Sequence, residues 1–194
     1  MARRYEMSAR ERARAATREE ILDAAVELFT PAWFDEVTLA DVAKRAGVSQ
    51  QTVVNHFGSK IDLFLTGISE RVAPRLAEAR AGVEPGDVRG IVASVVGDYE
   101  ESGDGNIRIV ALAGRMPELH EVVRRGRTWH RAWVEHVFTP QLKKRRGAAR
   151  ERVLTLLVTA LDVTTWKTLR RDEGLDQAQT AVHLEALVEG VLAA

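Results

Sequence analysis

The sequence predicts an all-α fold in two domains, and three observations support it. Apolar residues recur at helical spacing, and no stretch of the 194 residues sustains the alternation of a half-buried strand. Serine, threonine or aspartate stands where several of the helices begin, and glycine or proline stands where several end. The stretch RAGVEPGDVRG, residues 80–90, is rich in glycine and proline and indicates a joint between the N-terminal helices and the later ones.

Composition limits the class of protein. The chain has no cysteine, which excludes a disulfide framework, a thiolate metal site and a cysteine nucleophile, and which fits a reducing cytoplasm. No apolar run approaches the roughly 20 residues of a membrane span. The N-terminal residues lack the apolar core of a signal peptide. We therefore expect a cytoplasmic protein with no membrane partner.

The N-terminal end is basic although the net charge of the whole chain is zero. Residues 1–18 carry six arginines against two glutamates. We expect residues 1–16 to form a disordered basic arm, because such charge runs are typical of solvated tails. The alternative, an arm that reaches into a DNA minor groove, stays open.

A DNA-binding domain is expected over residues 17–65, and its first helix is expected over 17–29. Thr17 can act as the N-cap, with Glu20 completing a capping box. Apolar residues at helical spacing then form one face, and Pro31 follows the helix.

The next two helices are short and strongly capped. Thr38 and Asp41 form the second capping pattern, and Gly47 should end that helix with a positive φ. Ser49 should cap a third helix over residues 50–57. This order of elements is a helix-turn-helix.

The third helix has two different sides. Val53 and Phe57, with Val48 at the turn, are expected to anchor it. The other side carries hydrogen-bonding side chains, and asparagine and glutamine can pair bidentately with adenine in a major groove. Ser59 is expected to cap a fourth helix that begins at Lys60, where a helix N-terminus and an ammonium suit a phosphate.

An effector-binding and dimerisation domain is expected over residues 66–194. A polar break at SGDGN, residues 102–106, should divide its first long helix, and Gly126 should interrupt the next. We expect the basic run KKRR, 143–146, to be a solvated loop. The helices are expected over residues 87–102, 107–114, 117–138, 151–171 and 177–192.

The last two helices suggest self-association. Residues 153–163 are apolar on nearly every side, so the helix should be buried on nearly every side. A homodimer through a helical bundle achieves this burial, and the alternative is a purely internal helix. The expected interface residues are Leu156, Val163, Trp166, Leu184, Leu187, Val188 and Val191.

Aromatic residues in the middle helices suggest a pocket for an effector. Trp129 and Trp133 share one helix face and could form a wall for an apolar or aromatic compound. A plain packed core is the alternative. The expected lining residues are Tyr99, Met116, Trp129 and Trp133.

Other chemistry finds little support. No two of His120, His130 and His136 have the i, i+4 spacing of a helical zinc pair, so we expect no metal and no cofactor. No nucleophile elbow or phosphate-binding glycine loop is present, so we expect no enzyme. An all-helical enzyme and a DNA-organising protein without an effector stay as alternatives.

The pattern over residues 17–65 resembles the N-terminal domain of the TetR-like transcriptional regulators. Gln51 departs from the family pattern, where glycine is usual, and Val54 departs where a tyrosine usually reaches the DNA backbone. The matching residues are Thr38, Val42, Ala43, Ala46, Gly47, Val48, Ser49, Thr52, Val53, His56, Phe57, Lys60 and Leu63.

The resemblance implies a function. TetR-like proteins bind near-palindromic operators as dimers, usually repress, and release DNA when a small molecule binds the C-terminal helices. We therefore expect a repressor that a small hydrophobic or aromatic effector releases from double-stranded DNA. The expected DNA-binding residues are Arg18, Thr38, Ser49, Gln50, Gln51, Thr52, Val54, Asn55, His56 and Lys60.

Overall fold

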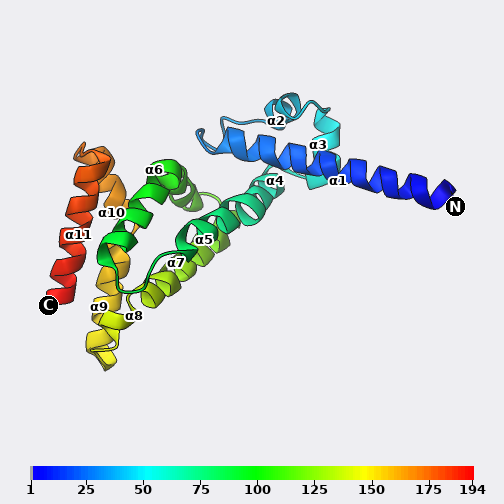
Figure 1. Ribbon diagram of the computed structural model, residues 1–194. Coiled ribbons are helices and arrows are strands. Elements are labelled where there is room, and N and C mark those ends of the chain that lie inside the picture. The colour runs from blue at the N-terminus through cyan, green and yellow to red at the C-terminus, as the bar shows by residue number, and fades with distance from the viewer. Residues whose placement is uncertain (1) are drawn as a thin grey trace. The chain divides into compact units, whose positions relative to one another are not determined.

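The computed structural model describes residues 2–194, with side chains from Ala9 onward. Every regular element in this part of the chain is helical (Figure 1), which confirms the predicted fold class. The chain divides into two units, Met1–Arg75 and Leu76–Ala194. The division falls within a helix, ten residues beyond the predicted boundary at residue 65.

The N-terminal unit is built around one long helix, against which shorter helices pack. Its elements are α1 (Ala2–Phe29), α2 (Leu39–Arg45), α3 (Gln50–Phe57), α4 (Lys60–Gly67), the π-helix η1 (Ile68–Val72) and the beginning of α5 (Ala73–Ala81). Ile21, Leu22, Val42, Val53 and Leu63 are fully buried. This core fixes the positions of α2 and α3.

The helix α1 begins at Ala2, so the predicted N-cap at Thr17 is wrong: this residue lies inside a continuous helix. The prediction of a disordered arm is likewise not met by residues 2–16, which are helical. Residues 9–16 are alanine, arginine and glutamate, which have high helix propensity, and they are exposed. The side chains of residues 1–8, including Arg3 and Arg4, lie outside the described residues.

The two short helices are capped as predicted. Thr38 forms a capping box with Asp41, and the Ser49 hydroxyl accepts a hydrogen bond from the Thr52 backbone N–H. Gly47, with φ of 68°, makes the turn between them. A side chain at this φ would be strained, so glycine is the residue that the turn favours.

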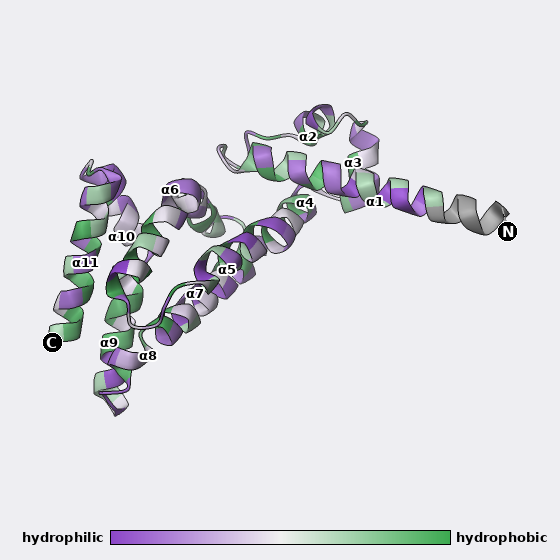
Figure 2. Cartoon of the chain, viewed as in Figure 1, coloured by the Kyte–Doolittle hydropathy of each residue, from purple (hydrophilic) through white to green (hydrophobic). Residues whose placement is uncertain are grey.

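The C-terminal unit is a bundle with one continuous apolar core. Its elements, after the end of α5, are α6 (Val88–Ala113), α7 (Glu118–Val137), α8 (Thr139–Leu142), α9 (Gly147–Ala160), α10 (Val163–Lys167), the π-helix η2 (Thr168–Asp172) and α11 (Gln177–Ala193). In Figure 1, α11 runs beside α9, with which it is in contact. Figure 2 shows many apolar residues along both helices.

The predicted break at SGDGN is absent, because α6 continues through it. A Cβ atom on Gly103 would stand only 2.4 Å from the ring of Trp166. The glycine therefore lets the fully buried indole rest against the helix backbone. Gly126 likewise does not interrupt α7.

The predicted single helix over residues 151–171 is also wrong. The chain ends α9 at Ala160 and starts α10 at Val163, with Asp162 as the N-cap of the second helix. The Asp162 carboxylate accepts a hydrogen bond of 2.9 Å from the Thr164 backbone N–H. In the described residues, no helix combines the length and the apolar character that crossing a membrane requires.

Candidate nucleic-acid interface and effector site

The helix α3 is held at its start and on its inner face. The hydroxyls of Ser49 and Thr52 lie 2.8 Å apart, and the Ser49 oxygen also accepts from the Thr52 N–H at 3.1 Å. Val53, one turn into the helix, is fully buried. Together the cap and the buried valine determine which side of α3 faces solvent.

That solvent-facing side carries amide groups. Gln50, Gln51 and Asn55 are all exposed. The Gln51 Nε2 donates to the Asn55 Oδ1 over 3.0 Å, as side chains four residues apart on a helix can. This bond uses one donor and one acceptor, and each amide keeps further groups free to bond a base edge.

The remaining α3 residues of the expected interface are partly buried. Thr52 is engaged in the cap, and Val54 contributes an aliphatic side chain. The ring centroid of His56 lies 6.3 Å from that of Phe57. These three residues therefore flank the amide face rather than project from it.

Thr38 is exposed, but its hydroxyl is part of the α2 cap. It donates to the Asp41 carboxylate over 2.6 Å and accepts from the Asp41 N–H at 3.1 Å. The hydrogen bonds that the Thr38 hydroxyl and backbone N–H donate to the carboxylate lower the pKa of Asp41. The residue thus orders the start of α2, whatever else it contacts.

Arg18 makes a partly exposed ion pair within the N-terminal unit. Its guanidinium donates to both carboxylate oxygens of Glu70, at 2.8 and 2.6 Å, and lies over the Phe57 ring at 5.3 Å. The hydrogen bond from Arg18 lowers the pKa of Glu70. The ion pair links α1 to η1 and neutralises the charge that the sequence analysis assigned to DNA.

Lys60 is half-buried at the start of α4. Its Nζ lies 4.3 Å from the centroid of the Phe34 ring. Burial lowers the pKa of this lysine, and the nearby carboxylates of Asp35 and Asp41 oppose the shift. A phosphate at this helix end would meet an ammonium already placed by the ring.

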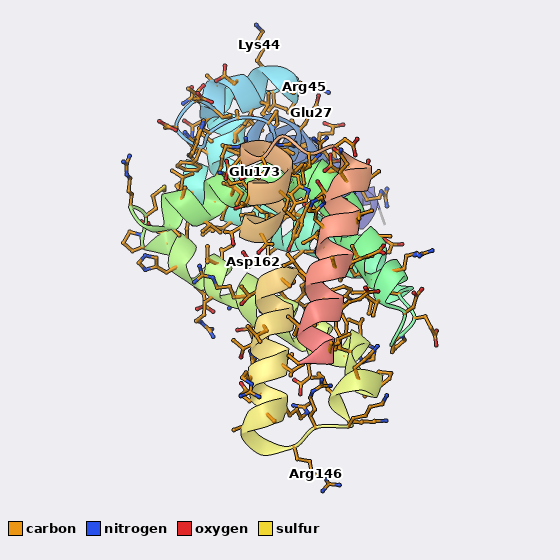
Figure 3. The ribbon with its side chains drawn as sticks, turned by 90° about the vertical axis from the view of Figure 1, so that its left-hand side faces the viewer. Glu27, Lys44, Arg45, Arg146, Asp162 and Glu173 are labelled. Atoms are coloured by element: carbon orange, nitrogen blue, oxygen red, sulfur yellow. The ribbon has the colours of Figure 1, made fainter. Side chains whose placement is uncertain are left out.

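Lys44 is a candidate that the sequence analysis missed. It is exposed in the last turn of α2 and makes no ion pair among the described residues. Its neighbour Arg45 pairs with Glu27 at 2.5 Å. Figure 3 shows Lys44 pointing away from the body of the helix. The sequence did contain a signal for Lys44. Val42 and Ala43 form the buried side of α2, so helical periodicity places Lys44 on the exposed side.

This helix-turn-helix has known relatives. Residues 21–66 match the sequence model of the bacterial regulatory proteins of the tetR family. The HTH-type transcriptional regulator AlkX of Mycobacterium tuberculosis is 41% identical over 68 residues, which are 35% of this chain and 32% of AlkX. The matched stretches cover between 27% and 52% of the curated relatives.

The likeness of fold extends over both units. A transcriptional regulator from Rhodococcus sp. Rha1 has a TM-score of 0.73 at 18% identity, covering 91% of this chain and 96% of that one. Residues 21–66 thus match the tetR family in sequence, and the chain as a whole is similar to this regulator in fold. The SmeT–triclosan complex is also similar in fold, with a TM-score of 0.65 at 19% identity, covering 92% of this chain and 90% of that one.

Three of the four residues predicted to line an effector pocket come together in the C-terminal unit, around an arginine. Arg80, only 3% exposed, lies over the rings of Tyr99, Trp129 and Trp133 at 5.4, 5.4 and 4.7 Å. Its Nη2 donates to the Asp98 carboxylate over 2.7 Å. The face of these aromatic rings is therefore occupied by a cation of the same chain.

The electrostatics of this cluster follow from burial. Burial raises the pKa of Asp98, and the Arg80 guanidinium opposes the rise. Burial also raises the pKa of Tyr99 to about 12. The pKa of His130 falls to about 4, first because of burial and then because of Arg80. The imidazole of His130 is thus neutral at pH 7.

Met116 is not part of the cluster, because it lies in the turn between α6 and α7. An open hollow of about 470 Å³ lies near that turn. Its lining is polar and apolar in similar measure, and Met116 is not in it. The lining residues are Val110, Ala113, Gly114, His120, Val123, Arg124, Arg127 and Thr128. Among the described residues, no group of three or more histidines and carboxylates could hold a metal ion.

The residues predicted for a dimer interface separate into two groups. Trp166, Leu184 and Val188 are fully buried in the core of their own unit, and Val163 is 9% exposed. Those four cannot form an outer surface, so the prediction is wrong for them. Leu156 and Leu187 are 42% and 45% exposed, and Val191 is half-buried. Helical periodicity could not tell an apolar side that faces the core from one that faces solvent.

Proposed function

We propose that this TetR-like protein is a homodimeric transcriptional repressor that reads a two-fold symmetric operator with α3 and leaves it when an effector binds. One observation carries the proposal. Gln50, Gln51 and Asn55 are exposed on a capped helix whose opposite side is fixed by the buried Val53. Exposed amides on a rigid short helix suit base edges in a major groove.

Within that face, Gln51 and Asn55 are proposed as the main base-reading pair. Their mutual hydrogen bond holds the two amides in one geometry before DNA binds. Less side-chain entropy is then lost on binding than for two independent amides. Val54 supplies an apolar contact that suits a thymine methyl group.

Phosphate contacts are proposed for Lys44, Lys60 and His56. Lys44 is exposed and unpaired among the described residues, and Lys60 stands at a helix start. Arg18 is assigned to internal structure instead, because its charge is matched by Glu70. Binding should weaken as salt concentration rises, since each phosphate contact releases counterions.

A dimer is proposed through α9 and α11. The exposed large apolar side chains of the described residues are Trp33, Leu156, Val182 and Leu187, and the last three lie on these two helices. One α3 reads only a few base pairs, and two copies about 34 Å apart can meet successive major grooves. The dimer is therefore part of the reading mechanism.

The dimer has a matched test. Leu156→Glu should yield monomers in sedimentation experiments and lose operator binding, because a charge would lie in the interface. Trp33→Glu is the control: its side chain is equally exposed, at 42%, but it lies in the N-terminal unit. An intact Leu156→Glu dimer would place the interface elsewhere.

A small-molecule effector is proposed for the C-terminal unit. The SmeT–triclosan complex supports this step, since that protein of similar fold holds a small aromatic compound. The cluster of Tyr99, Trp129 and Trp133 offers aromatic surface in this chain. Tryptophan emission gives a direct readout of binding there.

DNA reading is tested by selecting bound fragments from the source genome and footprinting the best one. A regulator should protect one site of dyad symmetry, whereas a DNA-organising protein should protect many unrelated sites. Gln51→Ala combined with Asn55→Ala should then weaken that site at least tenfold, on the order of 1–3 kcal/mol for each amide pair with a base. Gln177→Ala, an exposed glutamine on α11, is the matched control. Unchanged affinity and sequence preference in the double variant would refute the assignment.

A further inference from the structure

The buried Arg80 fills a site that is built for a planar cation. The guanidinium lies within 5.4 Å of the centroids of three aromatic rings, which attract cations to their faces. The carboxylate of Asp98 supplies the countercharge. These groups come from α5, α6 and α7, all within the C-terminal unit.

The hydrogen bonds of this site serve only two of the three guanidinium nitrogens. Nη2 donates to Asp98 at 2.7 Å, and Nη1 lies 3.3 Å from the Nδ1 of His130. The other ring nitrogen of His130 lies 3.4 Å from the Val158 carbonyl oxygen, so the ring donates there and accepts at Nδ1. Nε of Arg80 is buried and has no hydrogen-bond partner among the described residues.

An amidinium matches this pattern better than Arg80 does. It is a planar delocalised cation with two nitrogens, which correspond to the two that the site satisfies. It has no third nitrogen to be buried without an acceptor, and a buried unsatisfied donor is unfavourable. A primary ammonium lacks the planar pair of donors that Asp98 and His130 receive.

We propose that Arg80 is an internal stand-in for the effector, and that the effector is an organic cation of the amidinium class that displaces it. The inference rests on the proposed function and names the ligand class of that effector site. The apolar body of such a compound would lie against the rings of Tyr99, Trp129 and Trp133. Asp98 and His130 would receive its two nitrogens.

Displacement of Arg80 would act on the segment that leads to the DNA-binding unit. Arg80 lies on α5, five residues beyond the boundary between Arg75 and Leu76. Its ion pair with Asp98 fastens the end of α5 to α6, and the Trp133 indole donates to the Arg80 carbonyl oxygen at 3.4 Å. An occupied site would leave the Arg80 side chain without Asp98, so only the backbone contact to Trp133 would still hold this end of α5.

The site is tested first without DNA. Arg80→Ala should bind acetamidinium saturably at millimolar concentration, seen as a change in tryptophan emission and a rise in Tm. Methylammonium should have no such effect. Asp98→Asn in the Arg80→Ala background should weaken acetamidinium binding at least tenfold. Arg89→Ala, which removes an exposed arginine of α6, should not respond to acetamidinium.

A folded Arg80→Ala protein that ignores acetamidinium, or that responds equally to methylammonium, would overturn the proposed site. The wild-type protein provides a second measurement that needs no variant. Benzamidinium should change its tryptophan emission saturably, at a concentration about tenfold or more above that for Arg80→Ala, because the tethered Arg80 competes with it. A wild-type protein that shows no saturable change with benzamidinium would also overturn the proposal.

The regulatory step is tested on the selected operator. Arg80→Ala should bind it at least about tenfold more weakly than the wild type, as though effector were already bound. Acetamidinium should restore the Tm of this variant but not its operator affinity, because the free cation cannot fasten α5. Full operator affinity of Arg80→Ala, or restoration of its affinity by acetamidinium, would overturn the proposal that the Arg80–Asp98 ion pair controls DNA binding through α5. Absence of any operator for the wild type would instead refute the proposed function and leave the fluorescence result standing.

Discussion

The outer face of α3 and the cluster around Arg80 use hydrogen-bonding side chains in opposite ways. On α3, Gln51 and Asn55 are exposed and bond chiefly to each other. Around Arg80, polar groups are buried and bond across α5, α6 and α7. The exposed face can change partners at little loss, whereas the buried cluster can change partners only if another cation takes its place.

Breaking the buried cluster should give the largest effect on stability. Asp98→Ala leaves the Arg80 charge buried without its carboxylate, and should lower the free energy of unfolding of the C-terminal unit by about 3–5 kcal/mol. Urea unfolding followed by tryptophan emission measures this, because Trp129, Trp133 and Trp166 all lie in that unit.

The control for this variant is an ion pair at the surface of the same unit. Asp104 accepts two hydrogen bonds of 3.0 Å from Arg171, but both side chains are partly exposed. Asp104→Ala should therefore cost less than about 1 kcal/mol. Equal losses of unfolding free energy in Asp98→Ala and Asp104→Ala would show that burial does not make the Arg80 ion pair stronger than the surface pair.

Acid should weaken the cluster through His130. Its pKa is lowered from 6.5 to about 4 in the folded protein, so the unfolded chain takes up a proton first as pH falls. The contribution to stability is complete above about pH 6.5 and is lost progressively toward pH 4. It amounts to about 3 kcal/mol at most.

The pH dependence is measured as urea unfolding at several pH values. His130→Gln should flatten the slope between pH 6.5 and 4 relative to the wild type. His183→Gln, which changes an exposed histidine on α11, should leave the slope as it is. Parallel curves for the wild type and His130→Gln would contradict the buried neutral imidazole.

The two sides of α3 should respond differently to truncation. Val53→Ala removes a fully buried side chain and should destabilise the N-terminal unit by about 2 kcal/mol. Gln51→Ala should change its stability by less than about 0.5 kcal/mol while weakening operator binding. Thermal melts and gel shifts on both variants separate the supporting side from the reading side. A destabilising Gln51→Ala would mean that the amide is structural.

The smallest effect is expected at Lys44. Removing one phosphate contact should weaken operator affinity for all sequences about equally and reduce the salt slope by about 1. Arg45→Ala is the matched control on the next residue, because its guanidinium is already paired with Glu27. A gel-shift series over salt concentration measures both, and identical slopes for Lys44→Ala and the wild type would remove Lys44 from the interface.

The local elements of the N-terminal unit could be predicted because their causes lie close together in the sequence. The caps at Thr38, Ser49 and Ser59 each involve a residue three positions later, and Gly47 acts through its own φ. The prediction failed at Thr17, because capping potential does not end a helix whose upstream residues are themselves good helix formers.

The C-terminal unit was predicted less well because its decisive contacts join distant residues. The glycine-containing stretch in α6 stays helical while Trp166, 63 residues after Gly103, packs against its backbone. Val188 was assigned to a dimer interface, but the α6–α11 packing buries it within its own unit. Neither partner is apparent from local periodicity.

The sequence by itself determined the helical class, the helix-turn-helix and the exposed amides of Gln51 and Asn55, because helix signals act within about four residues. Only the tertiary structure decided that Arg18 is neutralised by Glu70, and that Arg80 occupies the aromatic cluster. Those outcomes depend on which charges folding brings together across 52 and 18 residues of chain. Burial and ion pairing are properties of the packed molecule, and sequence spacing alone does not specify them.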